Sequence, residues 1–333
     1  MKLYDQLGIN LDEIDRTLCN VLESDSSLSF SASSVKEHGL SLVRAGGKRL
    51  RPVMAIIGGR FGQVERYPYV LKAAAVLEYI HTASLIHDDI IDQSPLRRGQ
   101  PTLHTLTGVP KAVLIANYMM ARAVEWATET PEADSLGQAH SEEELERISS
   151  LASVITELCL GEYSQLRDRF NFDLSLDDYL AKTRNKTALL MAHCLKAGAD
   201  AAYADAEHSE LLFQFGEALG MAFQIKDDVL DFAEKKEAIG KPAGADLRNG
   251  IITLPVLYAM EAPAIRHEIA ALSAESPQED FDRVIAAING TDALERSLKL
   301  AQDYTDKAAQ AAERLGSHPA RVHLTTLIHY FAK

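Results

Sequence analysis

Residues 71–92 read LKAAAVLEYIHTASLIHDDIID, and in this stretch Ala, Leu and Ile recur every three or four residues. That spacing predicts a long helix, and because most of its faces are apolar, the helix should lie among other helices. The same periodicity predicts helices over 110–129, 142–165, 176–197, 206–232 and 292–315. We therefore expect an all-α fold, a single-domain bundle of about ten or more helices around a central cavity.

Composition narrows the class of protein further. Polar breaks at 24–34, 130–141 and 235–250 are too short to mark a domain boundary, so one domain over 1–333 is expected. The formal net charge of -14 disfavours nucleic acid as a partner. The N-terminus has no apolar signal segment, and no apolar run approaches the ~20 residues of a membrane span. We expect a cytoplasmic protein with no membrane span.

One acidic motif occurs twice, as DDIID at 88–92 and DDVLD at 227–231. Positions i and i+4 of a helix share a face, so the first and last aspartates of each motif should point together. Six carboxylates around one cavity would repel, since like charges at ~4 Å cost about 4 kcal/mol at an effective dielectric near 20. The motifs therefore predict bound cations, and oxygen ligands without a cysteine or histidine set favour Mg²⁺.

Three basic groups accompany the acidic motifs: GGKRLRP at 46–52, RRG at 97–99 and the pair Lys186-Thr187. Arg offers a planar fork of donors to phosphate oxygens, Lys offers a point charge, and glycines let backbone amides approach closely. The GGK string is not a P-loop, because the GxxxxGK[ST] spacing is absent. Acidic and basic groups together indicate a site for diphosphates bridged by metal ions.

Together with GEYSQ at 161–165, NKT at 185–187, FQIKDDVLD at 223–231 and GKPAGADLRNGIITLP at 240–255, these motifs resemble the trans-isoprenyl diphosphate synthase (polyprenyl synthetase) family. The resemblance is greatest to its medium- and long-chain bacterial branch, particularly the large catalytic subunits of two-component heptaprenyl diphosphate synthases. It implies an all-helical magnesium enzyme that joins isopentenyl diphosphate to an allylic diphosphate, farnesyl or geranylgeranyl diphosphate. The product would be an all-trans polyprenyl diphosphate.

Carried over by position, the resemblance also implies roles for single residues. Three magnesium ions would be held by Asp88, Asp92 and Asp227, with Asp89, Asp228 and Asp231 in support. The allylic diphosphate would contact Arg97, Lys186 and Lys241, and isopentenyl diphosphate would contact Lys48, Arg51, His81 and Arg98. Thr187 and Gln224 would turn oxygen toward the allylic cation, with Lys186 as the third catalytic residue.

Product length is expected to depend on Ala83 and Ser84, five and four residues before Asp88. Short-chain enzymes that resemble this one place Phe or Tyr there as a floor, whereas small residues let a growing tail pass toward 76–80. Each helical turn adds ~5.4 Å, about one isoprene unit, and each Å² of buried tail contributes ~25 cal/mol. We expect products of roughly C30 to C40, centred on C35. The alternative is that both small residues only permit close helix packing.

Assembly and the finer contacts complete the expectations. The resemblance implies a homodimer, or a heterodimer with a small regulatory subunit, in which the helix over 110–129 is buried. Asn117 stands where many family members have Asp, and Ile251 where many have Lys. The C-terminus is short and has only Lys333 as a cation. These departures concern the finer phosphate contacts and leave the principal metal ligands in place.

Three alternative functions are compatible with parts of the sequence. A partner-dependent or non-catalytic subunit would share the fold, but such subunits are expected to lose their acidic motifs. A geranylgeranyl diphosphate synthase would share the site but stop at a shorter product. A di-iron protein would use the ExxH sequence formed by Glu78 and His81, yet the chain has no convincing second copy.

Overall fold

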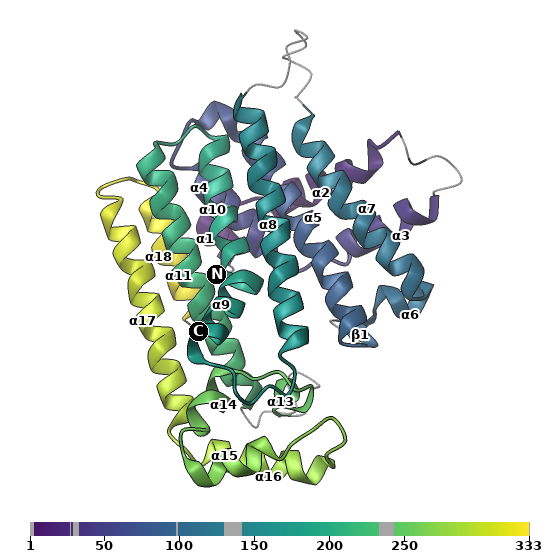
Figure 1. Cartoon of the computed structure of the whole chain (residues 1–333). Helices are drawn as coiled ribbons and strands as arrows, with labels where there is room; N and C mark the ends of the chain where they lie inside the picture. Colours follow the sequence, from purple (N-terminus) through teal and green to yellow (C-terminus); the bar gives the residue numbers. More distant parts are fainter. Residues whose placement is uncertain are drawn as a thin grey trace.

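The computed structural model describes residues 3–26, 28, 33–97, 99–129, 142–232 and 243–332. Helices dominate these residues (Figure 1), which confirms the all-α prediction. The two short strands among them, β1 (Leu96–Arg97) and β2 (Gln100–Pro101), form an antiparallel hairpin in which Leu96 pairs with Pro101. The described part contains more than ten helices, in agreement with the predicted ten or more, and several of them are too short to show a periodic pattern.

The elements of the first half of the chain are α1 (Leu3–Leu7), α2 (Leu11–Glu23), α3 (Ser33–Arg44), α4 (Leu50–Gly59), η2 (Val64–Arg66), α5 (Tyr67–Ile91), α6 (Leu103–Thr107), α7 (Val109–Thr128) and α8 (Glu142–Arg167). Those of the second half are α9 (Leu176–Thr183), η4 (Arg184–Ala188), α10 (Leu189–Ala201), α11 (Ala206–Phe232), α13 (Ala245–Arg248), α14 (Leu254–Ala259), α15 (Pro263–Ala270), α16 (Gln278–Asn289), α17 (Ala293–Arg314) and α18 (Arg321–Phe331).

Local sequence sets several helix ends. The Asn10 side chain accepts a hydrogen bond from the Asp12 amide at 3.0 Å, which satisfies a donor at the start of α2. Ser175 and Asp178 form a reciprocal capping box at the start of α9. Pro110 occupies the first turn of α7, where its missing N–H costs nothing.

The observed helices differ from the predicted ones mainly at their ends. The predicted helix over 206–232 matches α11, and α5 begins four residues before the predicted 71. The predicted helix over 176–197 is wrong as a single element, because the π-helical segment η4 separates α9 from α10. Apolar periodicity does not distinguish an α-helix from a short π-helical turn within it, since only one residue is added.

The central helices α4, α5, α10 and α11 pack directly on one another, and α7 lies beside α5 (Figure 1). Two glycines allow α4 and α10 to come close. A Cβ on Gly58 would lie 1.9 Å from the Leu195 carbonyl oxygen, and one on Gly198 would lie 1.8 Å from that of Ala55. Larger residues at either position would force the two helices apart.

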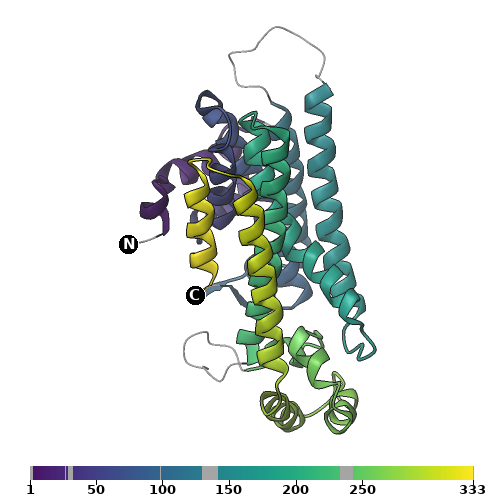
Figure 2. The same cartoon turned by 90° about the vertical axis from the view of Figure 1, so that its left-hand side faces the viewer.

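The apolar core has two parts. The larger cluster includes buried side chains of α4, α5 and α10, and the smaller one includes side chains of α14 and α16. Helices α11 and α17 contribute to both clusters and run side by side (Figure 2). The two long helices therefore connect the bundle to the short helices α15 and α16 at one end (Figure 1). Among the described residues, no helix is both long and apolar enough to cross a bilayer.

Candidate active site

The first acidic motif lies at the C-terminal end of α5. Asp89 is buried and forms an ion pair with Arg97, whose Nε donates to both carboxylate oxygens at 2.8 and 2.9 Å. Asp92 caps the helix and lies 2.8 Å from a guanidinium nitrogen of Arg169. The Oδ1 atom of Asp88 is buried and has no hydrogen-bond partner. A buried carboxylate oxygen without a hydrogen bond is costly unless a cation binds it, so of the three carboxylates Asp88 would gain most from a bound cation.

Burial raises the pKa of Asp88 to about 7, with further increases from Glu162 and Asp92 and opposing effects of Lys186 and Arg97. A carboxylate in this setting gains much from a divalent cation, which favours the ionised form. The residues present therefore fit the predicted magnesium ions. Within the described ranges, no three His, Cys, Asp or Glu side chains are grouped closely enough to hold a metal by themselves. Substrate phosphate oxygens would complete the coordination, as Mg²⁺ commonly requires.

The second acidic motif lies at the C-terminal end of α11 and has a different environment. Asp227 is exposed. Asp228 is buried, and its two oxygens accept hydrogen bonds from the Tyr179 hydroxyl at 2.7 Å and from the Gln224 amide at 2.8 Å. Burial raises the pKa of Asp228 to about 6, although both hydrogen bonds oppose this shift. Asp228 is thus a buried structural carboxylate rather than an accessible ligand.

The last aspartate of the second motif fixes the loop that follows. Asp231 accepts hydrogen bonds from the Ala245 and Asp246 amides at 3.2 and 3.0 Å, at the start of α13. The Asp231 carbonyl accepts another from the Gly244 amide at 2.7 Å. The six carboxylates expected around one cavity are therefore not equally available to a cation, because Asp228 is enclosed and Asp231 has backbone partners. These partners remove much of the repulsion that the sequence suggested.

The π-helical segment η4 carries Lys186 and Thr187. Lys186 donates to Glu162 of α8 at 2.9 Å, and the neighbouring carboxylate of Asp88 helps to raise the Lys186 pKa against the opposing effect of burial. A Cβ on Gly161 would lie 2.8 Å from the Lys186 amide nitrogen, so α8 approaches η4 closely only because this residue is glycine. Single π-helical turns occur frequently at functional sites.

Thr187 and Gln224 lie together, as the sequence expectation for them requires. The Thr187 hydroxyl donates to the Gln224 side-chain oxygen at 2.8 Å, and the Gln224 amide donates in turn to Asp228. This chain of hydrogen bonds uses the hydroxyl donor of Thr187 and one of the two N–H donors of Gln224. The remaining lone pairs of the two oxygens can face a positive charge.

Most of the basic residues predicted to bind the two diphosphates lie within the described ranges. Lys48 is exposed, Arg51 lies in the first turn of α4, and His81 is half-buried on α5. Arg97 lies on β1, where its ion pair with Asp89 places it beside the first acidic motif. Arg98, Lys241 and Lys333 lie outside the described residues.

The two proposed chain-length residues differ in exposure. Ala83 is fully enclosed in the larger core cluster, whereas Ser84 is half-buried and its hydroxyl donates to the His81 carbonyl at 2.9 Å. Ile80, Leu77 and Val76 are all buried within the same cluster. Of the two small residues, Ser84 is therefore the one more accessible to a ligand beside Asp88.

Four residues of this region have no role in the sequence analysis: Glu162, Arg169, Tyr179 and Lys182. Glu162 follows the glycine of GEYSQ, which was the only signal available for it. Lys182 is buried and donates to the Ile252 carbonyl at 3.1 Å, and burial lowers its pKa while Asp228 and Asp246 oppose that shift. Arg169 and Tyr179 meet their partners only through the tertiary fold.

The alternative di-iron site is disfavoured by the partners of its glutamate. Glu78 is buried and its Oε1 accepts a hydrogen bond from Arg49 at 3.1 Å, so its charge is balanced by a guanidinium. Such a carboxylate is poorly placed to bind iron, because the guanidinium would have to be displaced first.

The chain is similar to known proteins in both sequence and structure. A sequence model of the polyprenyl synthetase family matches residues 33–289. Heptaprenyl diphosphate synthase component 2 of Bacillus subtilis is 39% identical over 332 residues, 99% of this chain and 89% of that protein. The solved heptaprenyl diphosphate synthase of Staphylococcus aureus superposes with a TM-score of 0.85 at 30% identity, over 100% of this chain and 99% of the other.

A third relative was solved with ligands. The polyprenyl synthase of Caulobacter crescentus, complexed with calcium and isoprenyl diphosphate, superposes with a TM-score of 0.83 at 34% identity. The match covers 99% of this chain and 96% of that structure. That relative therefore binds a divalent cation and a prenyl diphosphate on the same fold.

Proposed function

This chain belongs to the polyprenyl synthetase family, and we propose that it condenses isopentenyl diphosphate with an allylic diphosphate in a single magnesium-dependent domain spanning 1–333. The product is a medium- or long-chain all-trans polyprenyl diphosphate, most nearly heptaprenyl. One observation carries this proposal. Asp88 has a buried oxygen without a hydrogen bond, and the positive charges of Lys186 and Arg97 act on this carboxylate. Carboxylate and cations are thus gathered where a metal-bridged diphosphate needs both.

The cations of the site hold and orient the allylic diphosphate. Lys186 and Arg97 each have a carboxylate partner in the free protein, Glu162 and Asp89, which keeps both side chains in place before substrate arrives. Lys241 is proposed as a third contact. Magnesium ions on Asp88, Asp92 and Asp227 would supply positive charge that stabilises the departing pyrophosphate.

Bond making follows from that arrangement. The allylic C–O bond breaks, its electron pair leaves with pyrophosphate, and the isopentenyl double bond attacks the resulting allylic cation. Thr187 and Gln224 turn oxygen lone pairs toward that cation, which their mutual hydrogen bond at 2.8 Å permits. Loss of a proton then restores a double bond, and released pyrophosphate is the base. Lys48, Arg51, His81 and Arg98 position isopentenyl diphosphate for the attack.

Product length is proposed to be roughly C30 to C40, because neither Ala83 nor Ser84 can block a growing tail and each turn of α5 adds about one isoprene unit. The half-buried Ser84 is the more accessible of the two. Relatives named as heptaprenyl diphosphate synthases support C35 as the central value.

The decisive experiment is incubation of the purified chain with labelled isopentenyl diphosphate, farnesyl diphosphate and Mg²⁺, followed by product chromatography. Formation of C30 to C40 prenyl alcohols after dephosphorylation, and their loss on adding EDTA, is expected. A C20 product would favour the geranylgeranyl diphosphate synthase alternative. Complete inactivity with every allylic primer would contradict self-sufficient catalysis.

Assembly provides a second test. The name "component 2" of the Bacillus relative indicates a two-part enzyme, so a homodimer and a heterodimer with a small subunit are both considered. The Leu114 side chain of α7 is 66% exposed, as a residue that becomes buried in an interface on 110–129 would be, and Val109, just before that range, is 46% exposed. Light scattering should show a dimer at micromolar concentration. A fully active monomer would contradict this, and an inactive dimer would indicate a missing subunit.

A further inference from the structure

The turn before α4 has an unusual backbone. Gly46, Gly47 and Arg49 have φ values of 72°, 156° and 44°, so three of four consecutive residues lie in the positive region. Glycine enters this region readily, but arginine does so at a cost. Something in the tertiary structure must therefore hold Arg49 in this conformation.

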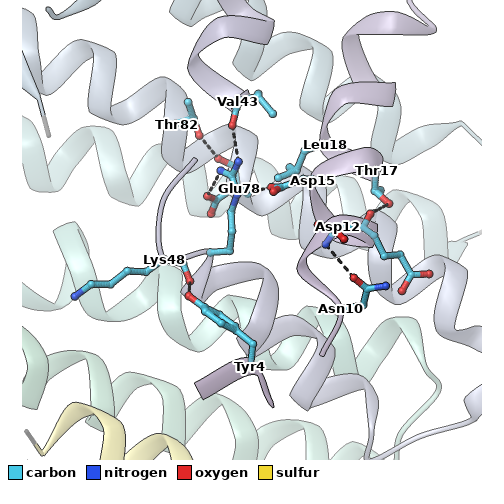
Figure 3. Close-up of polar contacts among 12 residues, drawn as sticks. Tyr4, Asn10, Asp12, Asp15, Thr17, Leu18, Val43, Lys48, Glu78 and Thr82 are labelled. Carbon is cyan, nitrogen blue, oxygen red and sulfur yellow. Dashed lines mark hydrogen bonds and ion pairs between the residues drawn. The ribbon is translucent and has the colours of Figure 1, made fainter. Parts of the chain in front are cut away.

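Three acceptors hold the Arg49 guanidinium, which is almost fully buried. Its Nε donates to Asp15 at 2.9 Å, one terminal nitrogen donates to Glu78 at 3.1 Å, and the other donates to the Val43 carbonyl. Figure 3 shows Asp15, Glu78 and Val43 close together, and they come from α2, α5 and the end of α3. With two carboxylates and a carbonyl around its guanidinium, Arg49 is not expected among the phosphate ligands.

The same turn has a second anchor in the N-terminal helices. The Tyr4 hydroxyl of α1 donates to the Lys48 carbonyl. Figure 3 shows the Lys48 side chain extending away from the Arg49 cluster, with its ammonium group far from those carboxylates. The backbone of Lys48 is thus fixed while its side chain remains exposed.

The helix that supplies Asp15 is itself firmly placed. Ile14, Leu18 and Leu22 of α2 are buried in the larger core, and the Leu18 carbonyl accepts a hydrogen bond from the Tyr79 hydroxyl of α5 at 2.6 Å. Both α1 and α2 lie before residue 33, where the match to the family model begins. Both helices therefore lie outside the residues matched by the family model, yet they contact a motif inside them.

We propose that α1 and α2 position the isopentenyl diphosphate-binding turn, with Tyr4 and Asp15 as positioning residues that act through the Lys48 carbonyl and Arg49. This inference rests on the proposed binding of isopentenyl diphosphate by Lys48 and Arg51. Arg49 lies between Lys48 and Arg51 in the sequence. A fixed backbone at Arg49 therefore also fixes the directions in which the Lys48 and Arg51 side chains leave the chain. Preorganisation of this kind lowers the entropy lost when the phosphates bind.

The test compares Tyr4→Phe and Asp15→Asn with wild type, using Tyr67→Phe as the matched control. The Tyr67 hydroxyl donates to Glu13 at 3.1 Å, so it also connects α2 to α5, but this hydrogen bond does not involve the turn at 46–49. Each of the two test variants should raise KM for isopentenyl diphosphate about threefold to tenfold, the effect of one lost polar contact. KM for the allylic diphosphate and kcat should stay within about twofold, and Tyr67→Phe should change none of these values.

Two results would overturn the inference. One is an unchanged KM for isopentenyl diphosphate in both folded variants, and the other is an equal change in both substrates' KM values. Melting temperatures would be measured alongside, and if one variant melts early the other decides the test. Asp15→Glu keeps the charge and serves as a further control that should retain the wild-type KM. An inactive wild type would instead contradict the proposed function, so the two failures are distinguishable.

Discussion

The two acidic motifs share one sequence pattern but balance their charge by different means. At the end of α5, two of the three carboxylates meet cationic side chains, Arg97 and Arg169. At the end of α11, Asp228 and Asp231 instead accept hydrogen bonds from neutral groups: a tyrosine hydroxyl, an amide side chain and two backbone N–H groups. The first motif therefore brings two guanidinium groups into the site, whereas these hydrogen bonds of the second motif come from uncharged donors.

The aspartates also differ in burial and in hydrogen-bond partners according to their position in the motif. The middle residue of each motif is buried and has its own partners, Arg97 for Asp89 and Tyr179 with Gln224 for Asp228. The first residues differ: Asp88 has a buried oxygen without a hydrogen bond, and Asp227 is exposed. Repetition of a motif thus identifies the helix ends that form a site, whereas the surroundings decide which oxygens are available to a metal.

The largest expected effect comes from the first residue of each motif. Asp88→Ala and Asp227→Ala should each lower the condensation rate by at least about a thousandfold, because loss of a metal ligand removes several kcal/mol of transition-state stabilisation. Melting temperature should stay nearly unchanged, since each substitution also removes like-charge repulsion. Steady-state assays would be compared with Asp303→Ala, an exposed aspartate on α17. Wild-type turnover in either variant would refute that residue as a ligand.

The next largest effect is on product length, which is expected to depend on α5 and not on α11. Ser84→Phe should place an aromatic floor one turn before Asp88 and shift the main product to about C15 or C20, since each turn corresponds to about one isoprene unit. Consumption of isopentenyl diphosphate should continue. Product chromatography gives the result, with Ser84→Ala as the small-residue control. An unchanged product distribution in an active Ser84→Phe enzyme would show that the tail follows another path.

The smallest effect tests the middle residues. Asp228→Ala should lower the free energy of unfolding by about 2 kcal/mol, because it leaves the buried Tyr179 hydroxyl and an amide without their acceptor. Asp89→Ala should cost less than about 1 kcal/mol, since Arg97 is partly exposed and water can solvate it. Denaturant unfolding measures both. In the double variant with Tyr179→Phe, part of the Asp228→Ala loss should be recovered, and equal losses at Asp89 and Asp228 would remove the distinction drawn between them.

Much of the fold follows from apolar periodicity. The pattern predicts α11 over its full length and places α5, α7 and α17 within a few residues of their observed ends. The predicted ranges leave out α1, α6 and α13, because helices of four or five residues are stabilised by their tertiary contacts rather than by a periodic face. They also leave out longer helices, among them α2 and α16. The pattern also misses η4, where one extra residue leaves the apolar pattern almost unchanged.

The site was predictable only in part, because local spacing does not show which residues far apart in the sequence come into contact. Spacing within one helix places Asp88 beside Asp92, and a resemblance to a known family brings Thr187 and Gln224 together in advance of their observed hydrogen bond. The ion pair of Asp92 with Arg169 joins residues 77 positions apart, and no local pattern predicts it. The burial of Arg49 is equally invisible in GGKRLRP, where it looks like one more phosphate-binding cation.

The continuous helical run from Leu176 to Ala201 changes its winding once, in η4. Because an α-helix advances about 100° per residue, the extra residue of a π turn sets the two flanking helices out of phase. Tyr179, on α9 before the π turn, can then face Asp228. Lys186, within the π turn, faces Glu162. Deleting one residue between 184 and 188 would restore regular winding and rotate α9 by about a quarter turn against α10. The spacing of this segment is consequently constrained against insertions and deletions, a constraint that no scan of substitutions would reveal.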